Sequence, residues 1–399
     1  MTTKYVEAPA GNEYLKILIL KDSRSETGIE GSATYVLTVC REFRAAGVEH
    51  TVVFNKKNLF FDQLTSEGTE VLLKELPPNG WRNYLHPIRL LRMRRDMTRI
   101  IEEGGYSHVW AHFSGLLTLI TNRVRKNGVK IIAHQHSAMP EGTKLTLLER
   151  KNFFSLKLFL SAAYRKFVLF NFAKADLVIC LTNDGKNTSI DTYGVSAEKI
   201  RIVPNGTDFG EKSFDFNLLL GSKLKSNQKT IISVGRETVE KGVVDFCKLA
   251  ANLADRSDVK FIFLGGGRNP EFQESLHQQY GAYVDFAGMQ FPIDEYFKEA
   301  YLQVFLTHRE GQGIVLGEAA QFGVPSVTWD AVGVREVMAE SGLGPIVKFQ
   351  DFEELTRQVA RLLDNDRHYE ELSKHVHAGR DHFTSKKNFE RMMSHFNEV

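Results

Sequence analysis

The sequence contains little cysteine and no long apolar run. Its three cysteines, Cys40, Cys180 and Cys247, lie far apart, and no C-x-x-C or Cys/His spacing connects them. This usage predicts reduced core thiols in a cytosolic protein. The first 14 residues lack the apolar segment of a signal peptide, and no uncharged apolar stretch reaches the roughly 18 residues of a membrane span. We therefore expect a cytoplasmic protein without a transmembrane helix.

A strong charge imbalance is also missing. Lys and Arg number 51 and Asp and Glu 49, so the net charge is only +2 and does not suggest a nucleic-acid binder. Charged residues make up 25% and hydrophobic residues 42% of the chain, which is typical of a globular protein. Because 399 residues exceed one ordinary core, we expect two domains.

Short apolar runs alternate with amphipathic stretches along the whole chain. The first series includes YLKILIL, VKIIAHQHS and KIRIVPNG, and a second series opens at KTIISVG and continues through LQVFLT and PSVTW. Strands that alternate with helices predict parallel sheets with helices on both faces. The two series therefore predict two Rossmann-like domains, joined within the turn-rich segment PNGTDFGEKSFDF.

Two glutamates bracket an uncharged turn that contains glycine. Glu310 follows the strand-like run YLQVFLT, and Glu318 lies about one turn inside the next predicted helix. The backbone N–H groups between them are expected to be the unpaired donors of a helix N-terminus, which attract phosphate. They belong to Gly313, Ile314, Val315 and Leu316. A carboxylate on each side suits the sugar hydroxyls at the two ends of a diphosphate, so the pattern predicts a nucleotide-sugar site.

A diphosphate also needs cations. Arg236 follows the strand-like run ISVG, and Lys241 lies near the start of the next predicted helix. Both residues fall at the carboxyl end of a strand in the same parallel sheet, so they can converge on phosphates there. The alternative interpretation is that they form ion pairs with the neighbouring acids Glu237 and Glu240.

Taken together, these motifs resemble those of the retaining glycosyltransferases of family 4. The family's two glutamates, separated by seven residues, match Glu310 and Glu318. Its GR....KG motif matches residues 235–242, and its PNG.D motif matches residues 204–208 with a shift of one place. Its first glycine loop is similar to TGIEG, so the resemblance extends over the whole chain.

The resemblance implies an α/β protein with the GT-B fold, in which two Rossmann-like domains face each other across a cleft. We expect an N-terminal acceptor-side domain at residues 1–207 and a C-terminal domain that binds the nucleotide-sugar at residues 208–384. The remaining residues, 385–399, are expected to form a C-terminal helix that packs back on the N-terminal domain.

The same resemblance implies roles for the motif residues. Glu310 contacts hydroxyls of the transferred sugar, and Glu318 contacts the ribose. Arg236 and Lys241 stabilise the diphosphate leaving group. Gly28 lets the first-domain loop approach that diphosphate, because a side chain there would collide with it.

A histidine after a first-domain strand usually faces the transferred sugar in this family. The run IIAHQHS offers His134 and His136, which strand alternation points in the same direction. We favour His136, at the strand's end, while His134 stays the alternative donor contact and either can be a buried core histidine. The chain departs from the family at Gln312, where an aromatic is usual, at Thr27, where glycine is common, and at Val332. The departure at Gln312 predicts a more polar sugar pocket.

The implied activity is a retaining transfer of a hexose from a nucleotide-sugar, for which we expect UDP, to a saccharide or polyprenyl-linked acceptor in surface polysaccharide synthesis. No Asp-x-Asp metal motif is evident, so we expect neither a metal nor another cofactor. The alternatives are a sugar phosphorylase, a nucleotide-sugar epimerase, or a non-catalytic GT-B partner protein. A dinucleotide oxidoreductase is disfavoured because no G-x-G-x-x-G follows the first strand.

Two first-domain segments bear on membrane binding. Residues 147–176 are apolar on nearly every side if helical and are interspersed with lysines, while residues 82–99 hold six arginines against one acid, Asp96. One interpretation is a buried helix and a solvated helix face. The other is a surface that binds anionic lipid, which predicts an enzyme held peripherally on the inner face of the membrane.

Overall fold

The structure is a computed structural model that describes residues 15–23, 31–74, 87–112, 123–136, 172–207 and 214–399. The chain divides into two compact units, the first formed by residues 1–204 with 388–399 and the second by residues 205–387. These division points lie three residues from the boundaries expected at 207 and 384.

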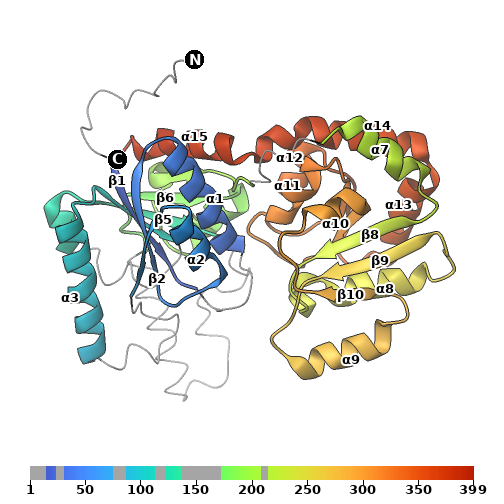
Figure 1. The fold of residues 1–399 in the computed structure, drawn as a ribbon, viewed down its shortest axis with the longest axis horizontal. Coiled ribbons are helices and arrows are strands. Elements are labelled where there is room, and N and C mark those ends of the chain that lie inside the picture. The colour runs from blue at the N-terminus through green and yellow to red at the C-terminus, as the bar shows by residue number, and fades with distance from the viewer. Residues whose placement is uncertain (1–14, 24–30, 75–86, 113–122, 137–171, 208–213) are drawn as a thin grey trace. The chain divides into compact units, whose positions relative to one another are not determined.

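The first unit is built on a seven-stranded parallel sheet with the strand order β3-β2-β1-β4-β5-β6-β7 (Figure 1). Its strands are β1 (Lys16–Lys21), β2 (Glu49–Phe54), β3 (Glu70–Leu73), β4 (His108–His112), β5 (Lys130–Gln135), β6 (Leu177–Cys180) and β7 (Ile200–Ile202). Every residue of β4 and of β6 is buried. This explains why these runs show no polar alternation, since a parallel sheet is covered on both faces.

Several helices belong to the same unit as this sheet. Those within the described residues are α1 (Gly31–Ala45), α2 (Leu59–Ser66), α3 (Pro87–Gly104), α6 (Asn183–Asp191) and the end of α15 (Ser385–Phe396). The last of these packs against the sheet and α1: Tyr35 Oη donates to Asn388 Oδ1 at 2.9 Å, and the ring of Phe396 stacks on His108. The chain's C-terminal segment therefore contributes to the core of the first unit.

The second unit contains a six-stranded parallel sheet with the order β10-β9-β8-β11-β12-β13. Its strands are β8 (Lys229–Val234), β9 (Val259–Leu264), β10 (Asp285–Gly288), β11 (Ala300–Phe305), β12 (Ser326–Trp329) and β13 (Ile346–Val347). Its helices are α7 (Phe216–Lys225), α8 (Val243–Asn252), α9 (Pro270–Tyr280), α10 (Asp294–Glu299), α11 (Ile314–Gln321), α12 (Arg335–Ser341), α13 (Phe352–Asp364) and α14 (Asp366–Gly379). The two parallel sheets confirm the predicted pair of Rossmann-like units.

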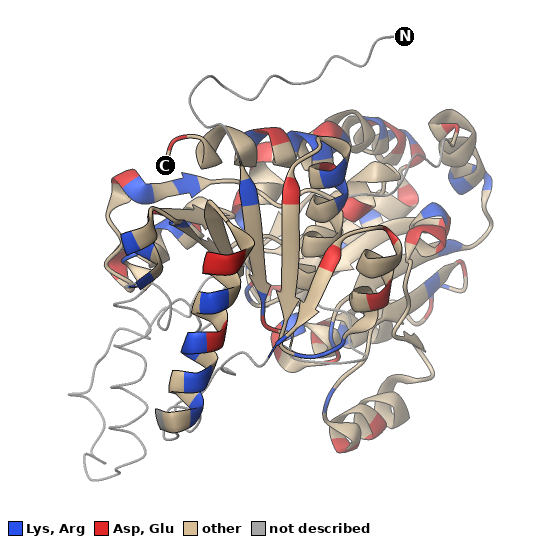
Figure 2. Cartoon of the chain, turned by 60° about the vertical axis from the view of Figure 1, so that its left-hand side comes forward, with Lys and Arg blue, Asp and Glu red and all other residues tan. Residues whose placement is uncertain are grey.

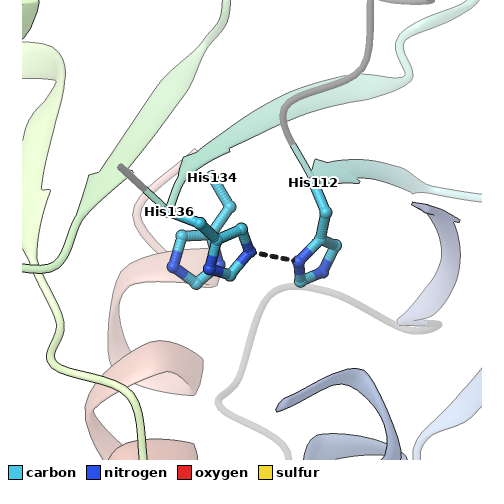
Figure 3. Close-up of side chains that lie close together, drawn as sticks. All are labelled: His112, His134 and His136. Atoms are coloured by element: carbon cyan, nitrogen blue, oxygen red, sulfur yellow. Dashed lines mark hydrogen bonds between the residues drawn. The ribbon is translucent and has the colours of Figure 1, made fainter. Parts of the chain in front are cut away.

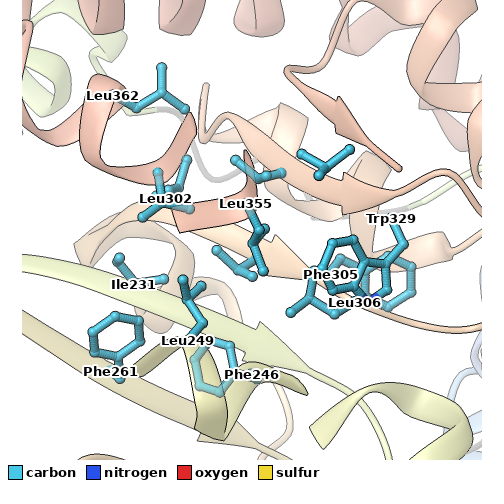
Figure 4. Packing of buried hydrophobic residues seen from close by; sticks show 14 of the residues in the cluster. Ile231, Phe246, Leu249, Phe261, Leu302, Phe305, Leu306, Trp329, Leu355 and Leu362 are labelled. Atoms are coloured by element: carbon cyan, nitrogen blue, oxygen red, sulfur yellow. The ribbon is translucent and has the colours of Figure 1, made fainter. Parts of the chain in front are cut away.

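The core of the second unit positions the strand ends that carry the candidate site. Ile231 of β8 and Leu302 of β11 pack with Leu249 of α8 and Leu355 of α13, all fully buried (Figure 4). Because β8 and β11 are neighbours in the sheet, the loops that follow them leave the same edge side by side. Arg236 and Glu310 lie in these two loops.

Two further expectations can be compared with the described residues. The three cysteines are free and buried, as predicted from their apolar contexts. Among the helices that the structure describes, none is long and apolar enough to cross a membrane.

Candidate active site

Glu310 lies in the loop between β11 and α11 and is held there by the loop that follows β12. Its N–H donates to the carbonyl oxygen of Val332 at 3.0 Å. Gly333 packs on the Glu310 carbonyl: with φ at +78°, a Cβ there would lie 2.0 Å from that oxygen, so only glycine fits. Val332, unusual for the family, thus supports the site through its backbone.

Lys241 forms an ion pair with Glu310, whose side-chain carboxylate accepts from Lys241 Nζ. The two residues are 69 positions apart in sequence, and their side chains are only 15% and 23% exposed. Lys241 ends a short 3₁₀ turn, and Gly242 then adopts a left-handed φ of +74° against the Leu306 backbone before α8 begins. Because of this turn, the side chain of Lys241, which follows β8 in the sequence, reaches the loop that follows β11.

The alternative in which the cations pair with neighbouring acids is wrong for Lys241. Glu240 instead pairs with Arg309 at 2.9 Å. Glu237 is buried and accepts from Gln273 Nε2 at 2.9 Å, besides contacting His277.

Arg236 lies in the same loop and is exposed. Within the described part of the chain it makes no ion pair, although its charge contributes to lowering the pKa of the Glu240 carboxyl, together with Arg309 and Lys241. An exposed guanidinium beside the Lys241–Glu310 pair leaves this sheet edge with positive charge that an anion can use.

The N-terminus of α11 faces this edge without a side-chain cap. Gly313 takes the N-cap position with φ at +80°, and a Cβ there would lie 2.9 Å from the Phe305 ring. Ile314 and Val315 follow at partly exposed positions. The expectation for Leu316 was wrong, because its N–H already donates to the Gly313 carbonyl at 2.9 Å. The donors that remain for an anion are therefore those at the very start of the helix.

Glu318 lies inside α11, one turn after its start. Burial, and to a smaller extent the nearby carboxylate of Asp294, raise the pKa of its carboxyl to about 8. The side chain therefore holds a proton at neutral pH. A ligand hydroxyl that donates to the carboxylate would oppose this shift, because hydrogen bonds to the charged form favour it.

Gln312 uses its side-chain amide within the protein. It is buried, its Oε1 accepts from Asn205 N at 2.6 Å, and its Nε2 donates to Asn205 O at 3.2 Å. Both ends of the amide thus hold the backbone of the first residue of the second unit. Gln312 therefore fixes the Glu310 loop to the segment at Asn205, a role that its position in the motif did not indicate.

Three histidines of the first unit, His112, His134 and His136, lie at the carboxyl ends of β4 and β5 (Figure 3). His134 and His136 point the same way, with ring centroids 4.1 Å apart, but His134 is fully buried and His136 is partly exposed at the strand's end. A third histidine, His112, lies opposite His134 in the strand register, and its Nδ1 is 2.7 Å from His136 Nε2. Its place at the end of WAHF, a neighbouring strand, was the sequence signal for it.

All three imidazoles are neutral at physiological pH. Burial is the main cause that lowers the pKa of each, to about 3 for His134 and well below the usual range for His112 and His136. Gly28, and residues 147–171 of the apolar segment, lie outside the described residues.

The comparisons with known proteins agree with this geometry. The sequence profile described as Glycosyltransferase Family 4 matches residues 29–211, and the profile described as Glycosyl transferases group 1 matches residues 220–378. The chain belongs to the GT-B glycosyltransferases of family 4 type. The first profile thus matches most of the first unit of this glycosyltransferase, and the second profile matches most of the unit that contains Lys241 and Glu310.

Relatives of known role share part of its sequence. The amylovoran biosynthesis glycosyltransferase AmsD of Erwinia amylovora is 25% identical over 211 residues, which are 52% of this chain and 58% of that protein. The 2-deoxystreptamine N-acetyl-D-glucosaminyltransferase of Niallia circulans is 30% identical over 163 residues, 39% of this chain and 42% of that protein. The matches span about half the length of these curated relatives.

Solved structures share its fold over nearly the full length. Anabaena HepE, crystallised in complex with UDP, aligns with a TM-score of 0.75 and 17% identity over 96% of this chain and 100% of that chain. A glycosyltransferase from Rickettsia africae aligns with a TM-score of 0.75 and 14% identity over 97% and 99% of the two chains. These likenesses establish the GT-B fold of this glycosyltransferase.

Proposed function

We propose that this protein is a retaining hexosyltransferase that moves a sugar from a UDP-linked donor to a saccharide or polyprenyl-linked acceptor in surface polysaccharide synthesis. One observation carries the proposal: Lys241 and Glu310, brought together from two loops, form an ion pair at the sheet edge where α11 begins without a side-chain cap. A lysine, a carboxylate and free helix N–H groups at one edge are the groups that a sugar diphosphate requires.

Each group then has a chemical task. Lys241, Arg236 and the first N–H groups of α11 stabilise the negative charge that grows on the departing diphosphate. The acceptor hydroxyl attacks the anomeric carbon from the same face of the sugar as the departing diphosphate, and it passes its proton to the leaving phosphate oxygen. Because the new bond forms on the face where the old bond breaks, the anomeric configuration is retained. Preorganised donors of this kind supply the largest catalytic contribution in many enzymes, and they make a metal unnecessary here.

The donor's two sugars occupy opposite ends of this arrangement. Glu310 accepts hydrogen bonds from hydroxyls of the transferred sugar, and Glu318 accepts from the ribose. His136 is the histidine that we favour for a contact with the transferred sugar. His134 is the weaker candidate for donor contact because its ring is fully buried. The complexes of Anabaena HepE with UDP, and with UDP-glucose, support the choice of a UDP-linked donor.

Turnover with a panel of nucleotide-sugars tests this proposal. Release of UDP from one UDP-sugar, dependent on an added saccharide or polyprenyl-linked saccharide, is the expected result, with the product's anomeric configuration determined by NMR. An inverted product contradicts the retaining mechanism. Fast UDP release without any acceptor, or no turnover with any donor and acceptor, contradicts the transferase assignment.

The surface of α3 supports a peripheral membrane location. One face of this helix carries Ile88 and Leu91, which are 76% and 62% exposed, together with the exposed arginines Arg92, Arg95 and Arg99. Figure 2 shows how basic residues, all of them arginines in this helix, recur along it. Their spacing places all five residues on one stripe, opposite the buried Met93, Met97 and Ile101. Exposed apolar side chains beside arginines are the composition of a helix that lies on an anionic bilayer.

Co-sedimentation with vesicles that contain anionic lipid tests this location. Each arginine near such a surface contributes about 1 kcal/mol, so changing Arg92, Arg95 and Arg99 to glutamate should weaken binding by at least about 3 kcal/mol. A variant with Arg335, Arg361 and Arg367 changed to glutamate alters net charge equally at exposed positions of the second unit. Equal loss in both variants, or no binding of the wild type at low salt, contradicts the assignment to α3.

A further inference from the structure

Glu237 is a buried carboxylate that follows directly after Arg236, and the proposed function gives it no task. Its side chain is 1% exposed, and among the described residues no lysine or arginine forms an ion pair with it. A buried carboxylate is costly unless hydrogen bonds compensate for the lost water. The hydrogen bonds that Glu237 accepts therefore indicate what it does.

Two side chains from one face of α9 hold this carboxylate. Gln273 Nε2 donates to Glu237 Oε2 at 2.9 Å, and His277 Nε2 lies 3.0 Å from the same oxygen. Because a carboxylate can only accept, His277 Nε2 carries a hydrogen and donates it. The ring of His277 also stacks on Phe286 of β10, with the centroids 4.1 Å apart. We call the two bonds from Gln273 and His277 to Glu237 the α9 clamp.

The backbone on both sides of Arg236 is fixed as well. Gly235 N donates to Leu264 O at 2.9 Å. Glu237 N donates to Gly266 O at 3.1 Å. The segment that contains Arg236 is therefore bonded through its backbone to the end of β9 and the loop after it, and through the carboxylate of Glu237 to α9.

Arg236 depends on this support because its side chain has little of its own. It is exposed, and within the described part of the chain it makes no ion pair. A long side chain loses conformational entropy when a ligand immobilises it, and a mobile backbone would add to that loss. Lys241 differs, because its ion pair with Glu310 already holds its side chain. The α9 clamp therefore matters most for Arg236.

We propose that Glu237 is a positioning residue that, through the α9 clamp, holds Arg236 where its guanidinium can bind the diphosphate of the donor. The contact with the diphosphate rests on the proposed function, whereas the hold of the clamp on the loop does not. If Glu237 served only the stability of the second unit, its loss would weaken ligand binding to the same degree whether or not Arg236 were present.

Hydrogen–deuterium exchange of the protein without ligand tests the clamp. Glu237→Met keeps the length of the side chain but removes the acceptor, so the amides of residues 236–241 should exchange about tenfold faster, while those of α13 should not change. Glu237→Gln keeps an accepting oxygen and should exchange like the wild type. The double variant Gln273→Leu with His277→Phe breaks the clamp from the α9 side and should reproduce the effect of Glu237→Met. Unchanged exchange of residues 236–241 in both clamp variants overturns the proposal.

Isothermal titration calorimetry with UDP tests the positioning of Arg236. Glu237→Met should weaken UDP binding about tenfold, which corresponds to one lost hydrogen bond to a charged group. Glu237→Gln should bind UDP nearly as tightly as the wild type. Gln279→Leu makes the same substitution as Gln273→Leu at an exposed position of α9, and it should leave the affinity unchanged.

A double-mutant cycle separates positioning from stability. In the Arg236→Ala background, Glu237→Met should cause no further loss of UDP affinity, because the side chain that the clamp positions is gone. In the Lys241→Ala background, the loss that Glu237→Met causes alone should persist. An equal loss in the wild-type, Arg236→Ala and Lys241→Ala backgrounds overturns the positioning of Arg236.

The outcomes also separate this inference from the proposed function. If the wild type does not bind UDP, the UDP-linked donor of the proposed function fails and the contact of Arg236 with its diphosphate fails with it, while the exchange experiment still decides the clamp. If the wild type binds UDP but the exchange of residues 236–241 does not change in the clamp variants, the proposed function stands and the role of Glu237 is refuted.

Discussion

Donor binding should become tighter as the pH rises from 6 to 8, because Glu318 must lose a proton before its carboxylate can accept ribose hydroxyls. Burial, and next the Asp294 carboxylate, raise the pKa of Glu318 to about 8. A glutamate in an ordinary setting has a pKa of about 4.3 and would be ionised throughout this range. The pH dependence therefore reports on the surroundings of Glu318.

The size of the effect follows from the ionised fraction. With a pKa of about 8, that fraction is about 0.01 at pH 6 and about 0.5 at pH 8. A ligand that binds only the ionised form has its apparent Kd divided by this fraction, so the Kd should fall about 50-fold between the two pH values. Isothermal titration calorimetry with a UDP-sugar measures this Kd. The ligand adds no pH dependence of its own, because its diphosphate diester stays fully ionised. Titration in two buffers of different ionisation enthalpy then detects the released proton.

Two variants isolate the group responsible. Glu318→Gln should remove the pH dependence and bind uniformly more weakly, because the amide can accept fewer hydroxyl hydrogen bonds. Asp294→Asn removes the like charge and should move the midpoint to lower pH while keeping the slope. An affinity that does not change with pH in the wild type, or an unchanged slope in Glu318→Gln, would refute the reasoning.

Three other predictions concern catalysis and stability. Lys241→Ala and Arg236→Ala should each lower turnover by about a hundredfold or more with the fold intact, whereas Lys260→Ala, which removes a surface ion pair in the same unit, should not. Turnover should persist in EDTA, and a loss restored by magnesium or manganese would show that a metal takes part. Lys223→Met should raise the melting temperature by its largest amount at pH 7 and below, and by progressively less as the pH approaches 10. Burial lowers the pKa of Lys223 to about 7, so the unfolded chain binds more protons between pH 7 and 10, and wild-type stability rises with pH across that interval.

The fold could be predicted because its signals are local. Apolar runs of strand length, separated by amphipathic stretches, are the direct consequence of a parallel sheet covered on both faces, and β4 and β6 are buried along their whole length for that reason. The order of strands within each sheet was not predictable in this way. It depends on which strand edges pair, and a run such as LVIC carries no sign of its neighbour.

Within the site, the sequence indicated which groups gather but not how they interact. Glu310, Lys241 and Arg236 follow neighbouring strands, so their meeting at one edge follows from topology. The pairing of Lys241 with Glu310, and of Glu240 with Arg309, depends on loop geometry that no spacing encodes.

Roles that depend on contacts between residues far apart in the sequence could not be predicted either. The replacement of an aromatic by Gln312 predicts a more polar sugar pocket, whereas in the structure its amide binds the backbone of Asn205, 107 residues away in sequence. The proximity of His112 to the other two histidines could not be predicted from the sequence. A single histidine at a strand end resembles any buried histidine until the residue opposite it in the neighbouring strand is known.

The ion pair between Lys241 and Glu310 gives the proposed donor a specific effect on the site. Before a donor binds, the lysine and the carboxylate neutralise each other, and the positive character of the edge comes from Arg236 and the start of α11. A diphosphate that enters brings negative charge, so Lys241 gains a second acceptor. Hydroxyls of the transferred sugar can then occupy the hydrogen-bonding positions on Glu310 that the lysine shared. Only a ligand with both an anionic group and a neighbouring polyol provides partners for Lys241 and Glu310 together. A phosphate alone would be repelled by the Glu310 carboxylate. A sugar alone would bring no negative charge to this positively charged edge. If the proposed function holds, the pair should therefore favour sugar diphosphates over either fragment.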